Sequence, residues 1–349
     1  MEIVMLKKRQ TEFDILRLIA ILAVISMHAG GNSYLEPHFS HAIHSSFVAG
    51  IVWCVPVFFL ISGRFFLDPE RNVTLEKIWR KYVPRVAIAF IVWSAVYSVY
   101  YVVSGGWGGL NIAGILNQFI VGPYHFWYLY SLIGLYLLTP FLRKIAADKK
   151  LLIYFLVLFA VFDITLEYMS FLPKVGGIIE TFAESFGMNM VVGYVGYFML
   201  GYYLHSIRDE MSTRAEITIY IIGIVMLIGT IWLNSILPSE LQDKYAIVQY
   251  KKPNVILYSS AIYLFFDKRV SKMNFSDQTR TVLGKLTELS FGVYILHALV
   301  NEFISYIPLP EQITYPHLVL CILTVIIYAI SLGLTWCIRK IPYIGRRIT

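Results

Sequence analysis

The chain has 349 residues, of which 58% are hydrophobic and only 15% are charged, and its mean hydropathy is +0.66. Soluble domains are about 45–50% apolar and about 25% charged, so this composition excludes an ordinary soluble core and indicates an integral membrane protein. The three cysteines, Cys54, Cys321 and Cys337, lie in apolar runs without paired spacing. They therefore indicate neither a disulfide framework nor a zinc site.

Apolar runs long enough to cross a bilayer, which takes ~20 residues in a helix, recur along the whole chain. In chain order they predict about ten transmembrane helices, near residues 12–31, 47–66, 83–103, 124–142, 151–171, 188–206, 216–236, 253–267, 286–306 and 317–338. The eighth is short and carries two serines, and without it the termini would lie on opposite sides of the membrane. We predict an all-α polytopic membrane protein with both termini cytoplasmic and residues 1–349 forming a single membrane-embedded domain.

The loops between these helices alternate in charge, and this alternation sets the predicted orientation. Cytoplasmic loops are enriched in Lys and Arg, and with a cytoplasmic N-terminus most of the 29 basic residues fall on that side. The outer segments hold Lys174, Lys244, Lys251 and Lys252, while Arg17 and Arg64 lie inside predicted helices. Topology thus explains the net charge of +7, and no nucleic-acid partner is expected.

The first predicted helix carries Arg17 and His28 in the stretch DILRLIAILAVISMH, and the run between them is too short to cross a bilayer. Their spacing puts both on one stripe of the helix, about 16 Å apart along its axis. Ionisable groups at membrane depth are costly and point to function by default. We expect Arg17 toward the cytoplasm, with Asp14 close enough to pair with it, and His28 toward the outer side as a candidate general base. The alternative is that Arg17 reaches the inner head groups and His28 lies at the outer interface.

Further arginines lie near the predicted inner ends of the second and third helices. Arg64 falls in FFLISGRFF, and Arg80 and Arg85 flank the start of the third helix. With Arg17 they would form a cluster of guanidinium groups, whose geometry suits phosphate. This predicts an anionic, phosphate-bearing cytosolic ligand. The alternative is that these arginines follow only the positive-inside rule and meet phospholipid head groups.

Two later stretches supply aromatic and histidine side chains. HFWYLYSLIGLYLLTPFL opens the fourth predicted helix, where we assign Tyr128 to the outer aromatic belt and keep Trp127 as a cavity-lining candidate. LSFGVYILHALV places Tyr294 and His297 on adjacent turns of the ninth helix. His297 falls near mid-bilayer, where it can face the same interior cavity as the first helix.

The first outer loop holds His38, His41 and His44, which recur at every third position. On a helix they would share one side and could hold a metal ion. The stretch from His38 to His44 contains no carboxylate or thiolate, so we expect no metal and leave the role of these histidines open.

Together these stretches resemble the acyltransferase family 3 membrane proteins. The resemblance rests on FDILRLIAILAVISMH, VPVFFLISG, the basic pair Arg80 and Arg85 leading into IVWS, FWYLYSLIGLYLLTP and SFGVYILH, in the family's order from residue 13 to 297. It implies an O-acyltransferase of the bacterial cell membrane. Such an enzyme moves an acetyl or other short acyl group from cytosolic acyl-CoA to a hydroxyl of an extracytoplasmic carbohydrate or similar acceptor. The family usually has an aromatic or aliphatic residue where this chain has Arg64, so assigning Arg64 to CoA rests on charge alone.

The resemblance also implies roles for individual residues. His28 matches the family's catalytic histidine, Arg17 matches its essential partner, and the arginine cluster would hold the phosphates of CoA. His28 would either deprotonate the acceptor hydroxyl or carry the acyl group itself. The acceptor is expected to be a cell-surface polysaccharide or glycolipid, recognised by the outer loops and helices or delivered by an accessory protein. A homo-oligomer is left open.

A transporter or flippase that moves an anionic metabolite or glycan along the same polar path is the main alternative. A structural or sensory membrane subunit is a third interpretation. Substitution of His28 distinguishes the acyltransferase from the transporter. A transporter should tolerate His28→Gln better than loss of Arg17, whereas acyl transfer should need both residues.

Overall fold

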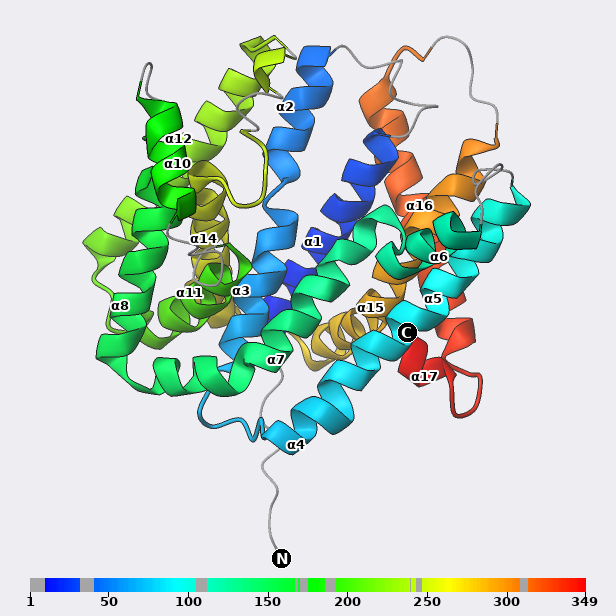
Figure 1. Ribbon diagram of the computed structural model, residues 1–349, viewed down its shortest axis with the longest axis horizontal. Helices are drawn as coiled ribbons and strands as arrows, with labels where there is room; N and C mark the ends of the chain where they lie inside the picture. The colour runs from blue at the N-terminus through cyan, green and yellow to red at the C-terminus, as the bar shows by residue number, and fades with distance from the viewer. Residues whose placement is uncertain are drawn as a thin grey trace, which may run out of the picture.

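The computed structural model describes residues 10–31, 41–104, 112–166, 169, 175–185, 193–238, 240–242, 247–307 and 313–349. Every element in these ranges is a helix and none is a strand (Figure 1), which confirms the predicted all-α class for the described residues. Seven helical stretches there are long and apolar enough to cross a membrane: α1 (Thr11–Gly30), α2 with α3 (Ile43–Phe66), α4 with α5 (Leu75–Val103), η3 with α7 (Tyr124–Ala147), α12 (Thr213–Ile236), α15 (Asp277–Ser305) and α16 (Pro316–Ile338).

The count of ten predicted spans is therefore matched only in part. The other three predicted spans correspond to shorter helices, which are α8 (Lys149–Phe159) continuing into the π-helical turn η4 (Ala160–Thr165), α11 (Tyr194–Ile207) and α14 (Pro253–Lys268). Both α11 and α14 pack against α3 inside the bundle. Because neighbouring protein surrounds them, their length need not equal the thickness of the bilayer.

Polar residues and prolines set where several helices begin. Ser212 and Ser276 cap α12 and α15 by accepting hydrogen bonds from backbone N–H groups in the first turn, and Asp148 does the same for α8.

The remaining elements are α2 (His41–Ile51), α3 (Cys54–Phe66), α4 (Leu75–Lys77), the π-helical turn η2 (Ile78–Tyr82), α5 (Val83–Val103), α6 (Ile112–Val121), η3 (Tyr124–Phe126), α7 (Trp127–Ala147), α10 (Gly176–Ser185), η6 (Val270–Lys272) and α17 (Gly345–Ile348).

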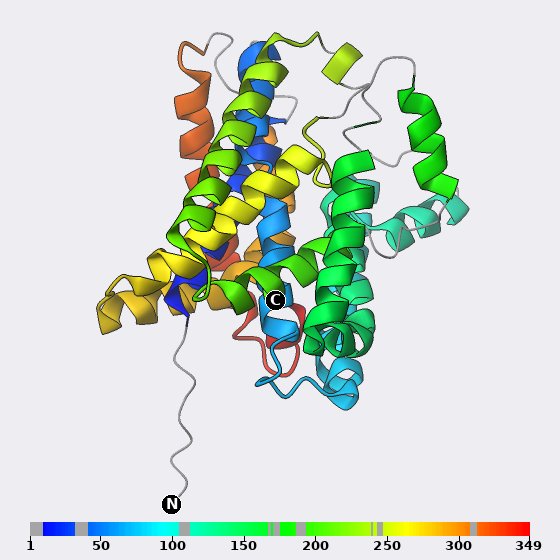
Figure 2. The same ribbon diagram turned by 90° about the vertical axis from the view of Figure 1, so that its left-hand side faces the viewer.

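Helix α1 lies in the interior of the bundle, where it packs against α3, α14, α15 and α16 (Figures 1 and 2). Phe13, Leu16, Ile21 and Ile25 of α1 are almost completely buried. Burying a large apolar side chain contributes about 1.5–3 kcal/mol, so α1 is held firmly from several sides. The polar residues that it carries therefore have fixed positions.

Helices α3 and α11 cross at a contact that only glycine allows. A Cβ atom on Gly63 would lie 1.7 Å from the carbonyl oxygen of Phe198, and one on Gly201 would lie 2.1 Å from that of Leu60. Both distances are far below van der Waals contact, so the backbones touch directly. This contact fixes α3, which also packs against α1, next to α11.

Candidate functional site

A cavity of ≈ 160 Å³ lies between α1, α3, α7 and α15. Helix α1 contributes Arg17, Ile21, Val24 and His28, whose spacing puts all four on one face of the helix. The other lining residues are Val55, Phe58 and Ser62 of α3; His125, Trp127, Tyr128, Leu132 and Tyr136 of η3 and α7; Tyr250; and Ser290, Phe291 and Tyr294 of α15.

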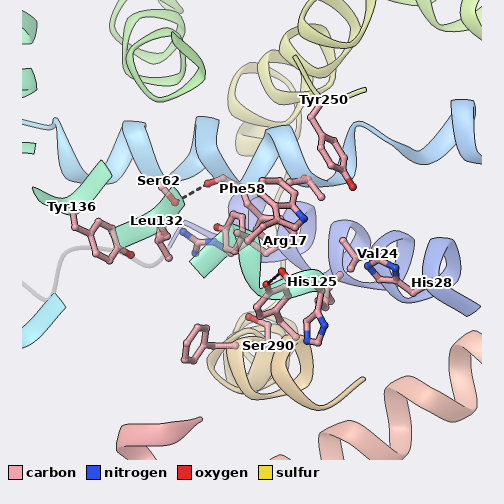
Figure 3. A pocket seen from close by; sticks show the side chains of 16 residues that line it. Arg17, Val24, His28, Phe58, Ser62, His125, Leu132, Tyr136, Tyr250 and Ser290 are labelled. Atoms are coloured by element: carbon pink, nitrogen blue, oxygen red, sulfur yellow. Dashed lines mark hydrogen bonds between the residues drawn. The ribbon is translucent and has the colours of Figure 1, made fainter. Parts of the chain in front are cut away.

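The cavity has two chemically different ends. Figure 3 shows Tyr136 and His28 at opposite ends of the row of lining side chains, with Arg17 between them in this view. Arg17 and His28 lie about 16 Å apart along the helix axis, at 1.5 Å per residue. The structure thus places both predicted residues in the lining of one cavity, at different depths.

Arg17 is positioned by its neighbours on α1 and α3. Its Nη1 lies 4.0 Å from Oδ1 of Asp14, and its guanidinium lies 5.0 Å from the centroid of the Phe65 ring. Asp14 is buried beside Arg17 and is not part of the cavity lining. The predicted pairing of Asp14 with Arg17 is therefore present as a long ion pair.

His28 lies in a group of three histidines, which we call the histidine cluster: His28, His125 and His297. The His28 and His297 ring centroids are 5.4 Å apart, and those of His125 and His297 are 5.0 Å apart. His125 is 3% exposed and His297 is completely buried. His297 was predicted to face the cavity, but of these three only His28 and His125 line it, because the His297 side chain is completely buried behind them.

Hydrogen bonds fix how the buried histidines can act. Nδ1 of His297 lies 2.6 Å from the carbonyl oxygen of Tyr294, and because a carbonyl only accepts, Nδ1 carries the proton and Nε2 is left as an acceptor. Nε2 of His297 and both ring nitrogens of His125 have no hydrogen-bond partner among the described residues. A buried polar group without a partner costs about 1–3 kcal/mol. Such a cost is typical of a site that completes its hydrogen bonds with a ligand.

Backbone carbonyls tie the three helices of the cluster together. The Tyr294 hydroxyl donates to the carbonyl oxygen of His125, and Asn301 Nδ2 donates to that of His28 at 3.3 Å. Tyr97 of α5 donates to the carbonyl oxygen of Ile295 at 2.8 Å. Tyr294, predicted from sequence, therefore both lines the cavity and holds His125 against α15.

Arg64 lies outside the cavity lining. It is 7% exposed, and its Nη1 lies 2.8 Å from Oδ2 of Asp68. Arg143 of α7 donates to the carbonyl oxygens of Phe66, Asp68 and Arg71 at 2.7, 2.9 and 3.1 Å. These contacts fasten the loop after α3 to α7. Binding of a phosphate by Arg64 stays a prediction, and this pairing favours a structural role.

The other two predicted arginines differ from each other. Arg80 is on the surface, where its Nη1 lies 3.1 Å from Oε1 of Glu76 and both side chains are largely exposed. Arg85 lies with its guanidinium 5.5 Å from the centroid of Phe291, a cavity-lining ring. The structure therefore brings Arg85 and Arg17 to the same end of the cavity, and it does not bring Arg64 or Arg80 there.

Two cavity-lining residues correct or extend the sequence analysis. Tyr128 was assigned to the outer aromatic belt, but it lines the cavity, with its ring 5.5 Å from that of Tyr294 and 5.0 Å from that of Phe59. The assignment is wrong because position 128 faces α3 and α15. His125 was not singled out, although it opens the HFWYLY stretch, because aromatic neighbours are typical of an interface.

The histidine triplet of the first outer loop is largely outside the described residues. His38 is not described, and of His41 only the backbone is. Within the described part of the chain, no group of three His, Cys, Asp or Glu side chains could hold a metal ion. The structure therefore does not test the triplet.

Comparison with protein families identifies the family to which this cavity belongs. A family model for acyltransferase family 3, described as an acyltransferase domain, matches residues 10–336. Searches of curated proteins and of solved structures found no match. The matched range includes every residue that lines the cavity.

Proposed function

The chain belongs to acyltransferase family 3, and on this premise we propose that it is a membrane O-acyltransferase that uses cytosolic acyl-CoA. The acyl group would be acetyl or another short chain. The acceptor would be a hydroxyl of a cell-surface polysaccharide, glycolipid or similar molecule outside the cytoplasm, and the protein would lie in a bacterial cell membrane.

One observation carries this proposal. Arg17 and His28 lie on the same face of α1 and line the same cavity, with about 16 Å between them along the axis. This separation is comparable to the length of an extended pantetheine arm. A thioester held near Arg17 by its phosphates would therefore present its carbonyl carbon near His28.

The reaction needs one base and one path for a proton. The acceptor hydroxyl oxygen attacks the thioester carbonyl carbon while His28 removes the hydroxyl proton. The tetrahedral intermediate then collapses, the carbon–sulfur bond breaks, and the CoA thiolate takes the proton from the His28 imidazolium. The products are the O-acyl ester and CoA–SH, so His28 returns to its starting state.

A second route uses the same residue as a nucleophile. A ring nitrogen of His28 attacks the thioester, CoA–SH leaves with the ring proton, and the acyl-imidazole then passes the acyl group to the acceptor hydroxyl. The two routes differ in one measurable species. A labelled acyl-protein that forms without acceptor and is absent in His28→Gln would support the second route.

We assign positioning roles to the other two members of the histidine cluster. His297 has its Nδ1 proton fixed on the Tyr294 carbonyl, so its Nε2 can accept a hydrogen bond from His28. His125 lines the cavity, with its ring centroid 5.0 Å from that of His297. Both residues would orient the base rather than exchange protons with the substrate.

Incubation of the purified protein with radiolabelled acetyl-CoA tests the proposal. We expect slow release of labelled acetate in the absence of acceptor, because water can replace the acceptor hydroxyl, and we expect CoA to bind. The matched variant His28→Gln should bind CoA but release no acetate. Absence of both binding and turnover in the wild-type protein would overturn the enzyme assignment, and transport without turnover would favour the transporter alternative.

A further inference from the structure

The segment that follows α16 folds back on the bundle. Helix α16 ends at Ile338, and a tight turn leads into α17 (Gly345–Ile348). The Gly345 N–H donates to the carbonyl oxygen of Ile341 at 3.1 Å. A Cβ atom on Gly345 would lie 2.0 Å from the carbonyl oxygen of Ile338. Only glycine fits there, so the turn is sterically defined.

Helix α17 is anchored between α5 and α15 (Figure 1). Nε1 of Trp93 donates to the carbonyl oxygen of Ile348 at 2.8 Å. Ile348 is 8% exposed and belongs to an apolar cluster with Val86, Phe90 and Leu296. The segment 339–349 is therefore part of the packed structure.

This fold places arginines beside the end of the cavity that holds Arg17. Nη1 of Arg339 donates to the carbonyl oxygen of Glu288 at 3.0 Å, one helical turn before Phe291 on α15. The Arg85 guanidinium lies over the Phe291 ring. Arg85 and Arg339 thus flank the stretch of α15 that lines the cavity.

Arg346 adds a third positive charge to this region. Partial burial lowers the pKa of Arg339, and the nearby charges of Arg85 and Arg346 lower it further, against the opposing carboxylate of Glu288. Arg346 lies two residues before Ile348, which belongs to the same apolar cluster as Val86, the residue after Arg85. Like charges gathered in one region repel one another, and an anion bound among them would offset this repulsion. Backbone contacts of α17 and α16 nevertheless keep the arginines together.

We propose that Arg85, Arg339 and Arg346 bind the phosphate groups of the nucleotide-bearing acyl donor, with the segment 339–349 as one wall of the site. The identity of the donor rests on the proposed function. Guanidinium groups bind phosphate oxygens in pairs, and three of them suit a ligand with several phosphates. The family model ends at residue 336, so Arg339 and Arg346 lie outside the range that the family match covers.

Titration of CoA into the purified protein in neutral detergent tests this inference. The double variant Arg339→Gln/Arg346→Gln should raise the Kd for CoA at least tenfold. Turnover of acetyl-pantetheine, which lacks the nucleotide and its phosphates, should change less than twofold. The control Arg214→Gln removes one exposed arginine of α12, on the other side of the bundle (Figure 1), and should leave the Kd unchanged.

The outcomes separate the two proposals. Equal CoA affinity in wild type and double variant would overturn this inference alone, whereas no CoA binding by the wild-type protein would overturn the proposed function as well. If the arginines instead bind anionic lipid, the double variant should have the CoA affinity of wild type. Its thermal midpoint should then rise less than that of wild type when short-chain phosphatidylglycerol is added, and this result would also overturn the inference. The thermal midpoint of the double variant without ligand checks that it is folded.

Discussion

The two ends of the cavity contrast in charge and in burial. Arg17 and Arg85 mark one end, where the Arg17 side chain keeps 28% of its surface exposed and Arg85 is exposed. The histidine cluster marks the other end, where His125 and His297 are almost completely buried and three ring nitrogens have no partner among the described residues. One end can attract and hold an anion from water, whereas the other places the partly exposed His28 beside two buried histidines.

This contrast predicts how kinetic effects divide between the two ends. Substitutions at the histidine cluster should act on kcat, because His28 meets the reacting atoms only after the donor is bound and the other two histidines orient His28. Substitutions at the arginine end should act on donor affinity and therefore on KM.

The largest effect is expected at His28. Loss of a general base typically lowers the rate by about 10²- to 10⁴-fold, so His28→Gln should lower kcat by that factor. Donor affinity should stay within twofold, as measured by CoA titration. Normal turnover in His28→Gln would show that His28 is not the general base.

Arg17 should be next, with the effect falling on KM. Loss of a charge-assisted hydrogen bond costs about 1.5–3 kcal/mol, which corresponds to roughly 10- to 100-fold in affinity. Arg17→Gln should raise the KM for acetyl-CoA by this factor. Arg17→Lys keeps the charge but loses the planar fork, so its KM should lie between those of wild type and Arg17→Gln. An effect of Arg17→Gln confined to kcat would contradict the role of Arg17 in donor binding.

His125→Phe should give a smaller and mixed effect. The ring is buried with two nitrogens that lack partners among the described residues, and replacing such a group by an apolar one of similar shape is nearly neutral or stabilising. We therefore expect a thermal midpoint equal to or above that of wild type, together with a kcat lowered about tenfold. An unchanged kcat would show that His125 only fills space.

Arg64→Leu should have the smallest effect on catalysis. Removing one partner of a buried ion pair costs about 3–5 kcal/mol, so the thermal midpoint should fall because Asp68 loses its 2.8 Å contact. The Kd for CoA of the folded fraction should stay within twofold. A large rise in the Kd for CoA without loss of thermal stability would show that Arg64 takes part in donor binding.

The stripe on α1 and the all-α class could be predicted from sequence because both depend on local periodicity. Arg17 and His28 needed only the helical repeat, and Asp14 needed only its spacing of three from Arg17. Tyr294 and Trp127 were found because each falls in a distinctive stretch within an apolar run.

The sorting of the arginines could be predicted only in part. Asp68 follows Arg64 by four residues, a helical spacing that the sequence shows, whereas Phe291, which lies under Arg85, is far along the chain. The helices α11 and α14 lie where spans were predicted but are shorter than the other spans, since helices enclosed by protein need not have the length that a bilayer sets.

Cysteine protection at Val24 tests the central claim, that the donor arm occupies the cavity between Arg17 and His28. Val24 lines this cavity and is 4% exposed, so a small methanethiosulfonate reagent can reach Val24→Cys only through the cavity. The background should carry Cys321→Ser and Cys337→Ser, because those two thiols are exposed whereas Cys54 is buried. Ile19→Cys, on an exposed position of the same helix, is the control.

We expect saturating CoA to slow modification of Val24→Cys at least tenfold and to leave the rate for Ile19→Cys unchanged. Adenosine 3′,5′-bisphosphate, which lacks the pantetheine arm, should protect neither position. Equal modification of Val24→Cys with and without bound CoA would contradict the account, because the arm would then lie elsewhere.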